Sequence, residues 1–239
     1  MRPILPAFLL VLWAGQAQAC ALALVLALDV SGSIDAGEFD LQTGGLADAL
    51  EDEQVVAAVE ALEGGMIATV THWSGASRQR QMIGWHRLSD GPSLARLGAA
   101  VREAGRAWRN FSTAIGEAVE HAVAVGQDAP EVCERRVIDV SGDGVSNEGR
   151  RPEGASAAAA AAGWTVNALV IRGAVPDPVR QYTREVIAGP GAFVEVAEGF
   201  EDYARAIRRK LLREIDPWLF VSERARSGPG TPAGSSARR

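Results

Sequence analysis

Lysine is almost absent from this chain of 239 residues: Lys210 is the only one, and the other basic residues are arginines. This scarcity argues against chemistry that needs a catalytic lysine. Histidine is rare too. The sequence predicts that His72 and His86 lie within strands and that His121 lies on a helix face, so we expect structural roles for all three.

Two common enzyme motifs are missing as well. The chain has no Gly-x-Ser-x-Gly, which argues against a serine hydrolase of the α/β-hydrolase type. No Gly-x-Gly-x-x-Gly follows its first predicted strand, which argues against a dinucleotide-binding domain. The net charge of −6 implies no general attraction to nucleic acid or to an anionic membrane. We therefore expect neither as a partner.

The N-terminus has the pattern of a secretory signal peptide, residues 1–19. Arg2 supplies the positive charge, residues 4–13 the apolar segment, and Ala17-Gln18-Ala19 a cleavage site of small residues. An uncleaved membrane anchor is the alternative. Because no later stretch is apolar and long enough to cross a bilayer, we expect no membrane span after cleavage. The sequence thus predicts an exported protein, periplasmic or secreted.

Strand-like and helix-like segments alternate from residue 20 to residue 222, which predicts one α/β domain. The first segment, Ala21 to Leu28, carries no polar side chain, as expected of a parallel strand buried on both faces. The predicted fold is a doubly wound, mostly parallel six-stranded sheet with one antiparallel edge strand and helices on both faces. Residues 223–239 are rich in Ser, Gly, Pro and Arg and predict a disordered tail.

The element boundaries follow from apolar periodicity and turn residues. Further strands are predicted at 66–73, 80–88, 135–140, 164–171 and 192–196. Helices are predicted from Phe39 to about Leu62, from Ser93 (as N-cap) to Trp108, from after Thr113 to about Val125, and at 155–162, 178–188 and 200–215.

The two cysteines, Cys20 and Cys133, stand at similar distances before two aspartates, Asp29 and Asp143, that follow buried strands. If these strands are parallel neighbours, both cysteines lie at the edge opposite the aspartates. Neighbouring strands are ~4.8 Å apart, which suits a disulfide. We therefore predict a Cys20–Cys133 bridge, with lipidation of Cys20 at the mature N-terminus as the alternative.

Oxygen-bearing side chains gather where strands end or helices begin. The set is Asp29, Ser31, Ser33, Thr113 and Asp143. Open α/β sheets place their binding sites at the carboxyl ends of the strands. Oxygen ligands without histidine or cysteine suit Mg²⁺, Mn²⁺ or Ca²⁺ and disfavour Zn²⁺. We predict a divalent-cation site, preferably for magnesium.

Three segments, taken in order, resemble those of a von Willebrand factor A domain. They are Asp29-Val30-Ser31-Gly32-Ser33 after an apolar strand, Thr113 before a helix, and Ser141-Gly142-Asp143-Gly144 after another strand. The similarity covers about 21–215. It implies a metal-ion-dependent adhesion site in which Ser31, Ser33 and Thr113 bind the metal directly and Asp29 and Asp143 act through water. The segments DVSGDG (139–144) and GPGAF (189–193) further resemble a bacterial family of exported A-type domains of uncharacterised function.

The resemblance implies binding rather than catalysis: a protein partner would offer an Asp or Glu to the metal. The alternative is a Mg²⁺-dependent phosphotransferase of the haloacid-dehalogenase type, with Asp29 as nucleophile. That chemistry needs a second carboxylate two residues after the first, where this chain has Ser31, and a basic residue for phosphate, whereas Lys210 lies far along the chain.

Overall fold

The computed structural model of the protein describes residues 19–217. The predicted signal peptide (1–19, apart from its last residue) and the predicted tail (223–239) lie outside the described residues. Among the residues that are described, no helix is both long enough and apolar enough to cross a membrane.

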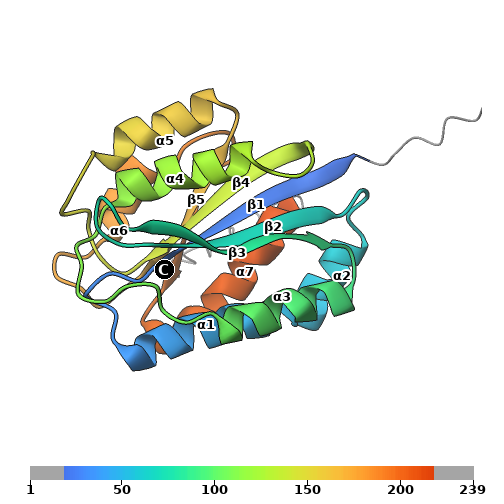
Figure 1. The fold of residues 1–239 in the computed structure, drawn as a ribbon, viewed down its shortest axis with the longest axis horizontal. Helices are drawn as coiled ribbons and strands as arrows, with labels where there is room; N and C mark the ends of the chain where they lie inside the picture. The colour runs from blue at the N-terminus through green and yellow to red at the C-terminus, as the bar shows by residue number, and fades with distance from the viewer. Residues whose placement is uncertain (1–18, 218–239) are drawn as a thin grey trace, which may run out of the picture.

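A six-stranded sheet forms the middle layer (Figure 1). Its strands are β1 (Cys20–Asp29), β2 (Met66–Trp73), β3 (Gln79–Leu88), β4 (Cys133–Gly142), β5 (Thr165–Ile171) and β6 (Val194–Ala197). They lie in the order β3-β2-β1-β4-β5-β6, and β3 alone runs antiparallel to its neighbour. The predicted α/β fold class and the antiparallel edge strand are confirmed. All ten residues of β1 are buried, so the apolar run forms a central strand.

Helices cover both faces of the sheet. One face carries α1 (Ala36–Leu50), α2 (Glu53–Glu60), α3 (Gly91–Glu103) and α7 (Tyr203–Ile215), which follows the 3₁₀ turn η2 (Phe200–Asp202) (Figure 1). The other carries α4 (Ile115–Gln127), α5 (Pro152–Ala161) and the short α6 (Val179–Gln181), which continues into a π-helical turn, η1 (Tyr182–Val186). Because side chains alternate along a strand, the leucines of β1 enter one core while Val25 and Ala27 enter the other.

The helix predicted from Phe39 to Leu62 is wrong as a single element. The chain leaves α1 at Glu51, and Asp52 caps α2 by accepting a hydrogen bond from the Gln54 amide at 2.9 Å. Both helices bury apolar residues toward the same core, so the apolar spacing continues across the break. An acidic residue at the break, Asp52, therefore starts a helix.

Other boundaries differ in smaller ways. Asp90, not Ser93, caps α3; Ser93 is the third helical residue and completes a capping box with Asp90. That helix ends at Glu103 rather than Trp108. The helix expected over 178–188 is α6 followed by the π-helical turn, which ends at Val186.

Two adjacent glycines in α1 predict opposite effects on stability. A methyl group on Gly44 would meet nothing within 4 Å, whereas one on Gly45 would lie 3.1 Å from Ala204 Cα and 3.0 Å from the Tyr203 ring in α7. Gly44→Ala should therefore stabilise the fold by about 0.5–1 kcal/mol through helix propensity. Gly45→Ala should destabilise it by about 1 kcal/mol or more through overpacking. Urea denaturation of the pair checks this, and equal shifts would contradict the described α1–α7 packing.

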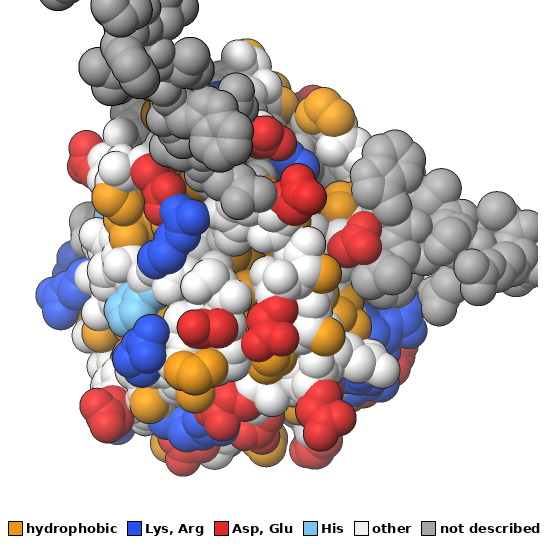
Figure 2. Space-filling view, turned by 90° about the vertical axis from the view of Figure 1, so that its right-hand side faces the viewer, with side chains coloured by type: hydrophobic (Ala, Val, Ile, Leu, Met, Phe, Trp, Pro, Cys, Tyr) orange, Lys and Arg blue, Asp and Glu red, His pale blue; other side chains and the backbone are white. Residues whose placement is uncertain are grey.

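Cys20 and Cys133 form a disulfide with a Cα–Cα distance of 4.4 Å. They are register partners at the start of β1 and β4, as the spacing to Asp29 and Asp143 predicts. The bridge lies at the amino ends of the parallel strands, on the side of the molecule that Figure 2 faces. Acidic and basic side chains are interspersed over the visible part of that side (Figure 2).

Candidate metal centre

The site begins at Asp29, the last residue of β1, whose side chain is fully buried. Its Oδ1 accepts a hydrogen bond from the Ser31 amide at 2.7 Å, which turns the chain sharply after the strand. Its Oδ2 is buried without a hydrogen-bond partner in the described structure. Such an atom is costly in a protein interior unless something else satisfies it.

Hydroxyl groups from two segments meet beside this carboxylate. Ser31 Oγ lies 3.3 Å from Ser33 Oγ and 3.3 Å from Thr113 Oγ1. Ser33 Oγ donates to Asp143 Oδ1 at 2.8 Å. The structure therefore brings these four side chains into one chain of contacts, and Asp29 precedes them at the end of β1.

Glycines let the three loops approach one another. A Cβ on Gly32 would lie 3.2 Å from Asn110 Cα, so the loop before α4 can lie against the turn after β1. A Cβ on Gly142 would lie 2.3 Å from the Tyr182 hydroxyl and 3.1 Å from Asp29 Oδ2. Glycine at these two positions is thus a steric requirement of the site.

Residues that the sequence analysis missed hold the loops in place. The Arg106 guanidinium donates to the Ser31 carbonyl at 2.7 Å and to the Val30 carbonyl at 3.1 Å. Asn147 Oδ1 accepts from the Thr113 amide at 2.9 Å, and the Asn147 amide donates back to the Thr113 carbonyl. No motif in the sequence marks either residue, because each acts on a loop that folding alone brings near.

The two carboxylates are unfavourable as charges in this environment. Burial, together with the nearby Asp143, raises the pKa of Asp29 to about 8. Burial also raises the pKa of Asp143, against the hydrogen bond from Ser33. A positive charge placed between them would offset both penalties.

This donor set fits a hard divalent cation. Within residues 19–217 no three His, Cys, Asp or Glu side chains gather as a metal cluster, so the candidate rests on three hydroxyls and two carboxylates. Oxygen donors of this kind suit Mg²⁺ or Mn²⁺. The buried, unpartnered Asp29 Oδ2 is an independent observation that fits a cation held at this site.

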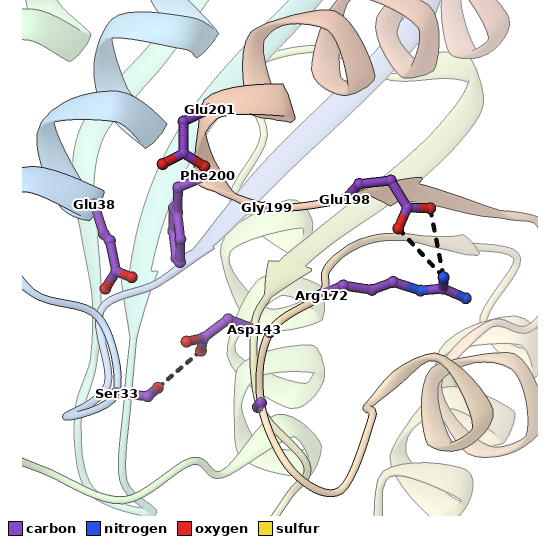
Figure 3. A pocket seen from close by; sticks show the side chains of 10 residues that line it. Ser33, Glu38, Asp143, Arg172, Glu198, Gly199, Phe200 and Glu201 are labelled. Carbon is purple, nitrogen blue, oxygen red and sulfur yellow. Dashed lines mark hydrogen bonds and ion pairs between the residues drawn. The ribbon is translucent and has the colours of Figure 1, made fainter.

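A cavity of about 460 Å³ opens next to the Ser33–Asp143 contact. Figure 3 shows Ser33 and Asp143 on one side of it, Glu38, Phe200 and Glu201 on another, and Arg172 paired with Glu198 at its rim. Ser33 and Asp143 of the candidate metal centre therefore border an open cavity.

The alternative haloacid-dehalogenase chemistry has little support in this geometry. That chemistry needs a carboxylic acid two positions after Asp29. This position is Ser31, whose hydroxyl contacts the Thr113 hydroxyl. Lys210 is fully buried against Asp139 and Glu214 and contacts none of the site residues.

His72, on β2, is buried and lies edge-on to Phe39. Burial, and to a lesser degree Arg106, lowers its pKa to about 4. Between pH 6.5 and 4, His72 takes up a proton in the unfolded chain but not in the native state. The contribution of His72 to the free energy of unfolding is therefore lost as the pH falls through this range. The full effect is about 3 kcal/mol. His72→Phe should flatten the fall in unfolding free energy between pH 7 and 4.5; parallel curves would contradict it.

Solved structures with the same fold include a matrix protein, a von Willebrand factor type A protein and a pilus adhesin. Proximal thread matrix protein 1 from the mussel byssus, in a structure with a zinc-occupied MIDAS motif, is 17% identical, with a TM-score of 0.60 over 82% of this chain and 46% of that one. The von Willebrand factor type A protein from Catenulispora acidiphila is 18% identical, with a TM-score of 0.58 over 82% and 43%. The pilus adhesin SpaC from Lactobacillus rhamnosus GG is 13% identical, with a TM-score of 0.62 over 83% and 31%.

The chain thus spans less than half the length of each of these three proteins, and the likeness at such low identity establishes the fold alone. No curated protein matches the chain by sequence. A family model does match, over residues 19–218. The chain has the von Willebrand factor A fold and belongs to the family described as proteins of unknown function, DUF1194.

Proposed function

We propose that this protein binds a protein partner through a magnesium-dependent adhesion site and catalyses no reaction. Ser31, Ser33 and Thr113 would hold the cation directly, and Asp29 and Asp143 would hold it through water. Mg²⁺ bound there would supply a Lewis-acidic position for a carboxylate. The observation that carries the proposal is the convergence of the Ser31, Ser33, Thr113 and Asp143 oxygens, at 2.8–3.3 Å from one another, at the end of the strand where Asp29 has a buried oxygen with no partner.

The surroundings of the site support a partner of defined chemistry. The cavity beside Ser33 and Asp143 gives an incoming Asp or Glu side chain a route to the metal face. Arg106 lies behind the Ser31 turn and adds fixed positive charge near an incoming carboxylate. Solved structures with this fold include a matrix protein with a zinc-occupied MIDAS motif and a pilus adhesin, which supports a binding role.

We further infer that the protein acts outside the cytoplasm, in the periplasm or after secretion. The signal-like N-terminus supports this, as does the Cys20–Cys133 disulfide, because disulfides persist in oxidising compartments. Pilus and byssus relatives are proteins of the same kind of environment.

Thr113→Ala tests the proposal, because it removes one metal-binding hydroxyl from a loop that Asn147 holds through the Thr113 backbone. We expect calorimetric titration with MgCl₂ to show at least a tenfold loss of affinity, and capture of a partner from the native envelope to become weak and insensitive to EDTA. Ser112→Ala is the matched control, since that neighbouring side chain is exposed. Partner capture that persists unchanged in EDTA would refute metal dependence.

A further inference from the structure

The only lysine of the chain, Lys210, is buried between Asp139 and Glu214, outside the candidate metal centre. Lys210 (0% exposed) lies on α7, with Glu214 (2%) one turn later, and both face Asp139 (1%) on β4. Lys210 Nζ is 2.5 Å from Glu214 Oε1 and 2.8 Å from Asp139 Oδ1. The proposed adhesion function makes no use of this cluster.

Charge does not balance if all three groups are ionised. Two carboxylates share one ammonium in an apolar interior, and an excess buried charge is expensive. The Arg135 guanidinium lies near Glu214 but donates to the backbone carbonyls of Glu214 and Ile215, not to either carboxylate. The cluster becomes neutral when it takes up one proton. Burial, opposed by Lys210 and reinforced by Glu214, raises the pKa of Asp139 to about 7, which favours Asp139 as the group that takes up this proton.

Asp139 contacts Lys210 without the well-aligned hydrogen bonds of an ordinary ion pair. The 2.8 Å approach of Lys210 lies outside the angles of a hydrogen bond, and neither Asp139 oxygen has a hydrogen-bond partner in the described structure. Glu214, in contrast, accepts hydrogen bonds from both Lys210 and Asn167. The amine is therefore next to a carboxyl group that no other side chain hydrogen-bonds, and a second carboxyl group contacts the same amine.

We propose that Lys210 and Asp139 form an intramolecular isopeptide bond, with Glu214 as the proton carrier. An amine, a protonated carboxyl group and an adjacent base in contact, shielded from water, are what direct amide formation needs. Arginine, which supplies every other basic side chain, could not form this bond. The single lysine of the chain stands where this chemistry requires an amine.

The reaction balances without an oxidant or cofactor. Glu214 takes one proton from the Lys210 ammonium, and the nitrogen lone pair forms a bond to Cγ of the protonated Asp139. A second nitrogen proton passes through Glu214 to the departing carboxyl oxygen, the C–O bond breaks, and water leaves. One amide and one protonated Glu214 remain, so the cluster is neutral before and after.

Asn167 is the rival electrophile, because it pairs with Asp139 across β4 and β5. Both ends of its amide are already engaged: Nδ2 donates to Glu214 Oε1 at 2.9 Å, and Oδ1 accepts from the Phe193 amide at 3.1 Å. We therefore assign it the role of orienting Glu214. The Phe193 ring, 5.5 Å from Lys210 Nζ, and buried Tyr203 help keep the cluster dry.

Mass spectrometry of the purified full-length, exported protein tests the proposal without any substitution. We expect an intact mass one water lower than that of the disulfide-bonded chain. Trypsin should yield residues 137–150 joined to residues 210–213, with no cleavage after Lys210. The full, uncrosslinked mass with free cleavage at Lys210 would overturn the proposal. Linkage to the peptide holding Glu214, or loss of ammonia with linkage to the peptide holding Asn167, would overturn the assignment to Asp139.

Two variants test the roles. Asp139→Asn should give a product of the same mass as the crosslinked wild type, because ammonia leaves in place of water. Glu214→Gln should leave the peptides unlinked, and full crosslinking in that variant would exclude Glu214 as the proton carrier. Lys210→Arg serves as the charge-preserving control and should have no link. If a variant does not fold, the wild-type mass still decides the proposal.

Discussion

Replacing Cys20 and Cys133 with alanine should lower the free energy of unfolding by about 4.7 kcal/mol, the value expected for a disulfide that closes a loop of roughly 100 residues. The two cysteines are 113 residues apart in sequence. The bridge joins β1 to β4, the two central strands that hold the candidate metal loops at their other ends. A domain of ordinary stability, about 5–15 kcal/mol, would lose a large part of it.

Guanidinium denaturation with and without a reductant checks this expectation. The reduced wild type and the double alanine variant should share one lowered midpoint, and the reductant should not move the variant. Magnesium binding by the folded protein should be unchanged, because the cysteines lie at the opposite ends of the strands from Asp29 and Asp143. A loss below about 1 kcal/mol would show that the bridge adds little beyond the strand pairing it accompanies.

Much of the fold follows from local patterns in the sequence. The apolar run of β1 predicts a central strand, and the similar spacing from each cysteine to an aspartate, nine and ten residues, predicts that β1 and β4 are neighbours with both cysteines at one edge. The break between α1 and α2 was not predictable from apolar spacing, because both helices pack on the same core. Nothing in the spacing of Tyr182–Val186 distinguishes a π-helical turn from an α-helix.

The residues of the candidate metal centre could be predicted from the sequence. The residues that hold its loops in place could not. Asp29, Ser31, Ser33, Thr113 and Asp143 stand at segment ends, where parallel topology places them together. Arg106 and Asn147 act through backbone groups of loops distant in sequence, so only the folded structure identifies them. The crowding of Gly142 against Tyr182 and Asp29 likewise depends on three separate elements.

Asp29→Asn should stabilise the metal-free protein while abolishing magnesium binding. Asparagine keeps the acceptor for the Ser31 amide and replaces the unpartnered Oδ2 with a donor, near a Tyr182 hydroxyl that also has no partner. The native pKa of Asp29, about 8, lies above its unfolded value. Stability is therefore lost as the pH rises from about 4 to 8 in the wild type. At pH 8 the variant should be more stable by about 1–2 kcal/mol.

Magnesium should reverse the order of stability. A cation at 100 times its dissociation constant stabilises the wild type by about 2.7 kcal/mol and should leave Asp29→Asn unchanged. Thermal denaturation at pH 8, with EDTA and then with saturating MgCl₂, measures both signs in one pair of proteins. Had Asp29 only a structural role, the variant would be less stable in both buffers. Equal stabilisation of both proteins by magnesium would place the cation elsewhere. The variant being more stable in EDTA and the wild type being more stable in MgCl₂ is thus the result specific to a buried carboxylate that lowers stability until a cation binds.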